Sequence, residues 1–260
     1  MCLAAFAAGA CDAFPLVVAA NRDESHRRLT AAADWWTEPS GILGGRDLEA
    51  GGGWLAVDRR GRLAAVTNRP SPKGRGFSGS RGHLVSDYLA AADSAETFCE
   101  ERARAPAEYG PYNLLLFDGD WLFHASNRTG VQWLAPGIHV LSNAPLGTSW
   151  PKTQFAAARL AAILEDEPGR DDLVRRLFEL LESRATQNAG ADGKELHWRA
   201  RTVFVTDPRY GTRSSTVVLM SRDGELMFAE RRFGADGRRR GESTFRFRAN
   251  RAVSGRVNRP

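Results

Sequence analysis

The chain has 260 residues, of which 42% are hydrophobic and 26% are charged, a composition typical of a globular protein. A chain of this length can bury a sizeable core. Its apolar runs are shorter than the roughly twenty residues that a transmembrane helix needs, so we expect no integral membrane segment.

The three cysteines, Cys2, Cys11 and Cys99, have no paired spacing, which argues against a disulfide framework. The chain contains no CxxC pair and its histidines are scattered, so a structural zinc site is not expected. The apolar start lacks the basic residues that open a secretory signal, and Asp12 interrupts it. We therefore expect a mature sequence in the reducing cytoplasm.

The formal net charge is +5, and the excess of arginine lies late in the chain. Arginine-rich tails can bind nucleic acid or anionic lipid. No aromatic stacking platform or recognition-helix motif accompanies this charge, so we predict a solvated tail and no nucleic-acid partner. We place the end of a single domain at Phe233 and expect residues 234–260 to form a partly disordered, arginine-rich tail.

In chain order, the first third predicts β-structure, with LAAFAA (3–8) and PLVVAAN (15–21) as strands and a hairpin over residues 51–70. A Gly/Ser/Pro-rich loop follows at 71–82, and helical spacing then predicts helices over 83–92 and 94–103.

Strands return in the middle of the chain, at 112–127 around an Asp-Gly turn, at 131–134 and at 138–143. Two helices are predicted over 151–166 and 171–184. The last quarter predicts strands at 201–207, a hairpin at 215–233 and a strand at 244–248. Segregated blocks of strands and helices predict an α+β fold with helices packed on antiparallel sheets.

Cys2 directly follows the initiator methionine and directly precedes a predicted strand. Methionine removal is favoured before a small residue such as cysteine, and it would leave a thiol and a free α-amine on one residue. An α-amine titrates near pH 8, so it can accept a proton from the thiol at neutral pH. The alternative is a structural cysteine that happens to be second.

Arg22 and Asp23 end the second predicted strand, which a hairpin would bring beside the start of the first. Asp23 would then hold the α-amine, and Arg22 would hold a thiolate or a substrate carboxylate. Adjacent strand residues point to opposite faces, so both reach one site only if the strand ends or bulges there. A charged turn is the alternative.

Asn68 and Asn143 both end predicted strands and are followed closely by proline. Asparagine at such a place makes a turn or donates its amide to a developing oxyanion. Arg213 precedes the strand of the last hairpin, in a segment that otherwise reads as a polar loop.

Taken together, the MC start, ANRDE, GGGWLAV, VTNRP, LSNAP and YGTRSSTVVL resemble the NRDE-motif family of the transport-and-Golgi-organisation type, from Met1 to about Phe233. That family looks like a branch of the N-terminal-nucleophile hydrolases, which implies a four-layer αββα sandwich. The cysteine-type hydrolases separate their arginine and aspartate by two residues, whereas Arg22 and Asp23 are adjacent here, a departure that bears mainly on the role of Arg22.

The resemblance implies roles for the residues noted above. Cys2 takes the place of the nucleophile, Arg22 and Asp23 the Arg/Asp positions, and Asn68 and Asn143 those of the asparagine donors. We expect Arg213 to be a further anion-binding residue. The implied activity is amidohydrolase or acyl-transfer chemistry on a small-molecule, non-peptide amide or thioester, with no cofactor.

The alternative implied by the family is a non-enzymatic protein that handles or transports haem or an acyl lipid. The chain has neither CxxCH nor a Cys-Pro dipeptide, so haem as a ligand rests on the resemblance alone. The sequence does not determine an oligomeric state.

Overall fold

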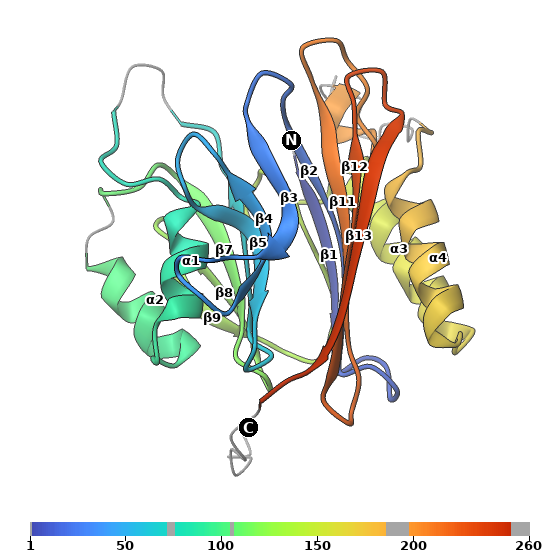
Figure 1. Ribbon diagram of the computed structural model, residues 1–260, viewed down its shortest axis with the longest axis horizontal. Coiled ribbons are helices and arrows are strands. Elements are labelled where there is room, and N and C mark those ends of the chain that lie inside the picture. Colours follow the sequence, from blue (N-terminus) through green and yellow to red (C-terminus); the bar gives the residue numbers. More distant parts are fainter. Residues whose placement is uncertain (1, 72–75, 105–106, 186–197, 251–260) are drawn as a thin grey trace.

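Two antiparallel sheets lie face to face in the computed structural model, each with a pair of helices on its outer face (Figure 1). The structure describes residues 2–71, 76–104, 107–185 and 198–250. The predicted α+β class and the four-layer αββα arrangement are therefore confirmed.

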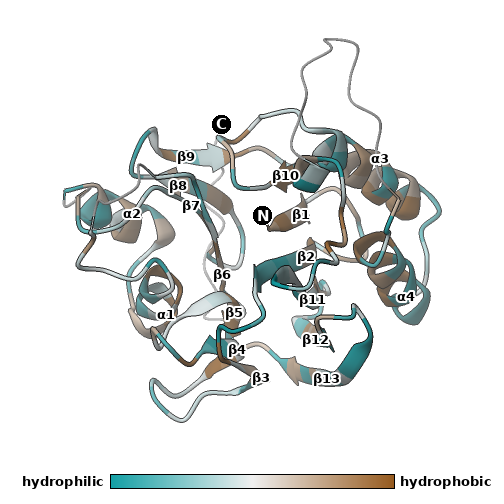
Figure 2. Cartoon of the chain, turned by 90° about the horizontal axis from the view of Figure 1, so that it is seen from above, coloured by the Kyte–Doolittle hydropathy of each residue, from teal (hydrophilic) through white to brown (hydrophobic). Residues whose placement is uncertain are grey.

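The six-stranded sheet has the order β10-β1-β2-β11-β12-β13. Its strands are β1 (Leu3–Ala8), β2 (Leu16–Ser25), β10 (Gly137–Leu141), β11 (Tyr210–Met220), β12 (Glu225–Phe233) and β13 (Arg239–Arg248). The helices α3 (Pro151–Glu165) and α4 (Arg170–Leu181) cover its outer face. The residues of β1 are hydrophobic (Figure 2), as expected for a strand that is buried on both faces.

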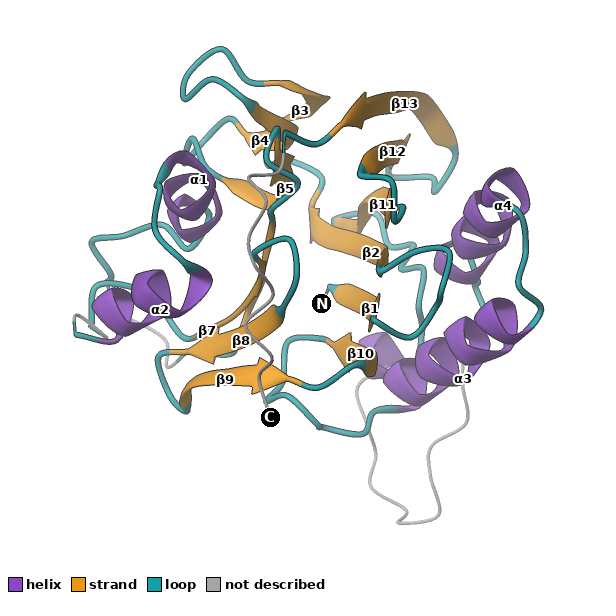
Figure 3. Cartoon of the chain, turned by 90° about the horizontal axis from the view of Figure 1, so that it is seen from below, coloured by secondary structure: helices purple, strands orange, loops and turns teal. Residues whose placement is uncertain are grey.

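The seven-stranded sheet runs in sequence order from β3 to β9. Its strands are β3 (Thr30–Trp35), β4 (Ile42–Asp47), β5 (Gly53–Asp58), β6 (Leu63–Asn68), β7 (Tyr112–Phe117), β8 (Leu122–Ser126) and β9 (Gly130–Leu134). The helices α1 (His83–Ala90) and α2 (Ala95–Ala103) lie outside it (Figure 3).

Strand alternation distributes side chains among three apolar layers. In β1 and β2, Phe6 and Val18 face the other sheet, whereas Ala7 and Val17 face the helices α3 and α4. A third buried cluster joins the seven-stranded sheet to α1 and α2. This alternation fixes which residues at the strand ends point between the sheets.

Three segments differ from the sequence-based expectations. The strands β3 and β4 carry no strong strand signal, because TAAADW and ILGGRD are rich in alanine and glycine, which are depleted in strands. Residues 201–207 were expected to form a strand but form none. The buried Val203 and Phe204 lie in an irregular segment. A short apolar run in the sequence does not distinguish a buried strand from a buried irregular segment.

The arginine-rich segment after Phe233 continues the sheet, contrary to the expected end of the domain there. Residues 239–248 form β13, which pairs antiparallel with β12 along its length. Its alternating exposed and half-buried residues place arginines outward and Phe245 and Phe247 against the inter-sheet core. Residues 251–260 of the expected tail lie outside the described residues.

Gly52, in the GGGW segment, lets β5 approach the start of α1 directly. A Cβ at Gly52 would lie 2.3 Å from the carbonyl carbon of Gly82, a distance that no side chain can occupy. The Gly53 N–H donates to the Gly82 carbonyl at 3.1 Å. The glycines therefore anchor the segment before α1 against the strand that it crosses.

A buried polar network around Asn113 ties the two sheets together at one end. The amide nitrogen of Asn113 on β7 donates to the carbonyls of Ser142 (3.2 Å) and Ala144 (2.9 Å), which follow β10 of the other sheet. Thr67 on β6 also donates to the Ser142 carbonyl, at 2.8 Å. Burial lowers the pKa of His124 to about 4, so its neutral ring donates to the Asn113 Oδ1 at 3.3 Å.

We predict that Asn113→Ala lowers the free energy of unfolding by about 2–3 kcal/mol, because buried acceptors lose their donor. Urea denaturation measures the change. The matched control is Asn250→Ala, whose side chain is exposed. Equal stabilities for the two variants would contradict a structural role for the network.

Candidate functional site

A cavity of about 530 Å³ opens between the sheets at the end where β1 begins. It brings together residues from both sheets and from the connections around them. Five of the six residues predicted for the site line it: Cys2, Arg22, Asp23, Asn68 and Asn143. The predicted site is therefore assembled from segments far apart in the sequence.

Cys2 is held in place by its backbone carbonyl. The hydroxyl of Ser142, just after β10, donates to this oxygen at 2.6 Å, and the ammonium of Lys152 on α3 donates at 3.3 Å. The Cys2 thiol lies 3.7 Å from the backbone carbonyl of Asp23. Three elements thus fix the residue that precedes β1.

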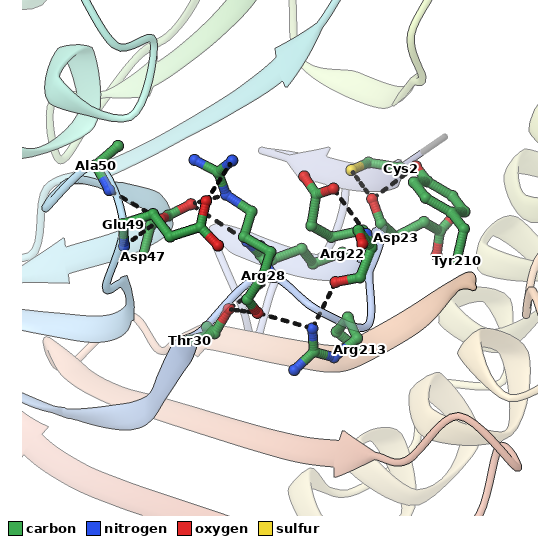
Figure 4. A network of polar contacts seen from close by, with 12 residues as sticks. Cys2, Arg22, Asp23, Arg28, Thr30, Asp47, Glu49, Ala50, Tyr210 and Arg213 are labelled. Carbon is green, nitrogen blue, oxygen red and sulfur yellow. Dashed lines mark hydrogen bonds and ion pairs between the residues drawn. The ribbon is translucent and has the colours of Figure 1, made fainter. Parts of the chain in front are cut away.

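Asp23 lies beside Cys2 and is buried (Figure 4). Its Oδ1 accepts a hydrogen bond from the Thr212 hydroxyl at 2.7 Å. Its backbone carbonyl accepts one from the Tyr210 hydroxyl, also at 2.7 Å. Both donors come from the start of β11, so this strand positions the carboxylate.

The ladder between β2 and β11 is irregular beside Arg22 and Asp23. Asp23 pairs with Thr212 and Arg22 pairs with Ser214, so Arg213 is an extra residue on β11. Such an irregularity increases the local twist of the strands. Arg22 and Asp23, although adjacent on β2, both line the cavity.

Arg22 reaches toward the seven-stranded sheet. Its guanidinium donates to the Thr30 hydroxyl at 3.1 Å and lies 3.5 Å from the Asp47 carboxylate. Arg28 contacts the same carboxylate at 2.5 Å. Burial alone would raise the pKa of Asp47, but hydrogen bonds from Arg28 and from backbone N–H groups hold it below its ordinary value.

The charges around Cys2 oppose one another. Burial raises the pKa of the Cys2 thiol, and the negative charge of Asp23 raises it further. Burial also raises the pKa of Asp23, while the charge of Lys152 counteracts that shift. Burial lowers the pKa of Lys152, which the charges of Asp23 and Cys2 partly offset. The buried lysine therefore favours the ionised forms of both neighbours.

The two asparagines meet across the cavity. The Asn143 side-chain amide donates to the Asn68 backbone carbonyl at 2.5 Å. A side-chain amide carries two hydrogens, so one remains for another acceptor. The Asn143 Oδ1 is buried and has no hydrogen-bond partner among the described residues.

Arg213 is not brought to the cavity. It donates to the backbone carbonyls of Ser25 (2.8 Å) and Arg28 (3.0 Å) in the turn between β2 and β3. The guanidinium thus holds the turn that carries Arg28. Of the tryptophans in the chain, Trp54 is the one that lines the cavity.

Three residues of this region were missed from the sequence. Asn21 is buried and ties β2 to Leu181 of α4, to Val203 and to Ser215, so it is structural. Tyr210 holds the Asp23 backbone. Lys152 could have been noticed in the sequence, because it is one of only three lysines among 36 basic residues.

Among the described residues, no group of three or more His, Cys, Asp and Glu side chains is placed to hold a metal ion. None of the described helices combines the length and the apolar character needed to cross a bilayer.

A model of the family described as Transport and Golgi organisation 2 matches residues 1–235. The chain belongs to this Transport and Golgi organisation family. The homolog from Bos taurus is 34% identical over 258 residues, covering 91% of this chain and 94% of that protein. The Homo sapiens homolog is 31% identical over 240 residues, covering 85% of this chain and 87% of that protein.

A solved structure shares the fold of this family member. It is a variant of conjugated bile acid hydrolase from Clostridium perfringens, with a TM-score of 0.51 and 10% identity, covering 98% of this chain and 100% of that chain. At this identity the likeness shows the fold alone, which agrees with the αββα sandwich implied by the sequence motifs.

For this member of the Transport and Golgi organisation family, we predict that Lys152→Met shifts the pH dependence of Cys2 alkylation to higher pH. Loss of the neighbouring positive charge disfavours the thiolate, and each unit of pKa shift changes the thiolate fraction about tenfold. Iodoacetamide labelling between pH 6 and pH 10, followed by peptide mass spectrometry, measures the midpoint.

The matched control is Lys152→Arg, which keeps the charge and should leave the midpoint near that of the unmodified protein. A Cys11→Ser background removes the second partly exposed thiol, while Cys99 is buried. An unchanged midpoint in folded Lys152→Met protein would show that the lysine does not act on the thiol.

Proposed function

We propose that the protein catalyses acyl transfer to water from a small-molecule, non-peptide amide or thioester, with Cys2 as the nucleophile. The observation that carries this proposal is the placement of the Cys2 thiol at the cavity beside the buried Asp23 carboxylate, with the Cys2 carbonyl fixed by Ser142 and Lys152. A fixed nucleophile beside an ionisable group is the arrangement that covalent catalysis needs.

Removal of Met1, which lies outside the described residues, would free the Cys2 α-amine. The amine takes the thiol proton, directly or through a water molecule. Asp23 then holds the resulting ammonium, while Lys152 offsets the second negative charge created in the buried site. The activated form is a thiolate and an ammonium on one residue.

The thiolate attacks the substrate carbonyl carbon and forms a C–S bond, which moves charge to the carbonyl oxygen. The remaining amide hydrogen of Asn143 and the side chain of Asn68 are the donors proposed for this oxyanion. One such donor contributes roughly 3–4 kcal/mol to the transition state.

Collapse of the tetrahedral intermediate breaks the bond to the leaving group, which takes the proton from the ammonium. Water then attacks the acyl-thioester and gives a proton to the free amine. Release of the carboxylic acid restores the thiol. The cycle consumes one water and needs no further reactant.

The test is hydrolysis of a panel of acyl-amides and acyl-thioesters by unmodified protein, Cys2→Ala and Cys2→Ser. We expect activity to fall by about a thousandfold or more in Cys2→Ala, because loss of a nucleophile removes the covalent pathway. Cys11→Ser is the matched control and should retain activity.

Intact mass spectrometry of the active protein accompanies the panel. We expect a mass that lacks Met1, since a retained methionine blocks the proposed base. Activity from protein that retains Met1, or full activity in Cys2→Ala, would refute the mechanism.

The second candidate, from the family resemblance, is non-enzymatic handling of haem or an acyl lipid in the same cavity. The thiol of Cys2 is the lining group suited to ligate haem iron, and lining arginines are suited to its carboxylates. Among the described residues, the cavity lining includes neither histidine nor methionine as a second ligand for haem iron. A spectral shift at micromolar haem that disappears in Cys2→Ala would instead support this candidate.

We further propose a reducing, cytoplasmic location, which is supported by free thiols at Cys2, Cys11 and Cys99.

A further inference from the structure

Among the described residues, four arginines line the cavity, and they form two groups. Arg22 and Arg28 share the Asp47 carboxylate, and Arg28 also contacts Glu49 at 3.5 Å. Their charge is therefore already compensated within the protein. Arg69 and Arg81 form the other group, at the ends of the loop between β6 and α1.

Neither Arg69 nor Arg81 forms an ion pair with a carboxylate in the described part of the chain. Arg69 donates to the Ser126 hydroxyl at 3.3 Å, and Arg81 donates to the Pro111 carbonyl at 3.3 Å. Both partners are neutral. These hydrogen bonds hold the two guanidinium groups without pairing either of them with a carboxylate.

The two arginines are linked through Pro111, which contacts the backbone of one and the guanidinium of the other. The Pro111 carbonyl that accepts from the Arg81 guanidinium also accepts the Arg69 backbone N–H at 2.9 Å. Neither residue is fully exposed to solvent, and burial lowers the pKa of Arg81, with the charge of Arg28 adding to the effect. Both cations line the same cavity, where a bound anion would offset the cost of burying them.

The rest of the wall limits what that anion can be. Glu24 also lines the cavity, and its charge partly offsets that of Arg81. The excess is therefore small, and it suits one singly or doubly charged group rather than a polyanion. Arg69 directly follows Asn68, so the anion would lie on the same wall as a proposed oxyanion donor.

From this geometry we propose that Arg69 and Arg81 form a binding subsite for a carboxylate, sulfonate or phosphate carried by the small-molecule substrate. Planar guanidinium groups suit such oxygens because they donate paired, charge-assisted hydrogen bonds. The subsite rests on the proposed function only in assigning its ligand as the substrate of Cys2. Its role is recognition: it selects anionic acyl compounds over neutral ones of the same length.

Binding to Cys2→Ala protein tests the subsite without turnover. The probes are N-decanoylglycine and N-decanoyltaurine, with N-decanoylethanolamine as the neutral analogue, and a decanedioic acid monoamide that carries its charge on the acyl end. Isothermal titration calorimetry at two salt concentrations gives each Kd. We expect at least one anionic probe to bind about tenfold or more tightly than the neutral analogue.

Arg69→Gln and Arg81→Gln should each remove most of that preference while leaving the affinity for the neutral probe unchanged. Arg81→Lys keeps the positive charge and should retain part of the preference for anionic probes. The matched control is Arg175→Gln, an exposed arginine of α4, which should behave as the parent. Circular dichroism confirms that each variant folds.

The two proposals fail separately. A charge preference lost in the arginine variants, without turnover by the unmodified protein, supports the subsite and refutes the proposed hydrolase. Turnover of neutral and anionic probes with equal kcat/KM, together with equal Kd values, refutes the subsite and leaves the nucleophile standing. Tight binding of inorganic phosphate alone, with no preference among the probes, would also refute a substrate subsite.

Discussion

The structure of the site depends on the carbonyl oxygen of Cys2. It accepts hydrogen bonds from Ser142, at the end of an adjacent strand, and from Lys152, at the start of α3. A buried ammonium is costly to desolvate, so its place here requires compensation. Asp23 and the Cys2 carbonyl provide it, and the same contacts fix the thiol against the cavity.

The hydrogen bonds at the Cys2 carbonyl are connected to the rest of the fold. The Ser142 backbone carbonyl accepts from Thr67 and Asn113 of the other sheet, while its hydroxyl holds Cys2. A disturbance between the sheets would therefore reach Cys2 through one residue, Ser142. The arginines that line the cavity also fall into two groups. Arg22 and Arg28 are paired with Asp47, whereas Arg69 and Arg81 donate to neutral groups and their charge remains available to a ligand.

Much of the fold could be predicted from the sequence, because strong local patterns coincide with real elements. The hairpins around the Asp-Gly turns and the amphipathic helix α4 are examples. The strands β3 and β4 were missed because alanine and glycine give no local strand signal. Pairing within the sheet outweighs their low strand propensity. Residues 203–205 are buried without pairing as a strand. A strand at 244–248 was predicted, but its pairing with β12, which extends the sheet beyond Phe233, is a tertiary contact that composition does not reveal.

For the site, the sequence by itself determined the chemical groups: a second-position cysteine, an adjacent arginine and aspartate, and asparagines at strand ends. Their types and their positions at strand ends follow from short-range patterns. Only the tertiary structure decided which of them meet. The register of β11 against β2 shifts at Arg213, beside Asp23. Arg213 itself holds a turn, and Lys152 comes from a helix that is 150 residues away from Cys2 in the sequence. Such convergence depends on strand register and helix packing, which long-range contacts set.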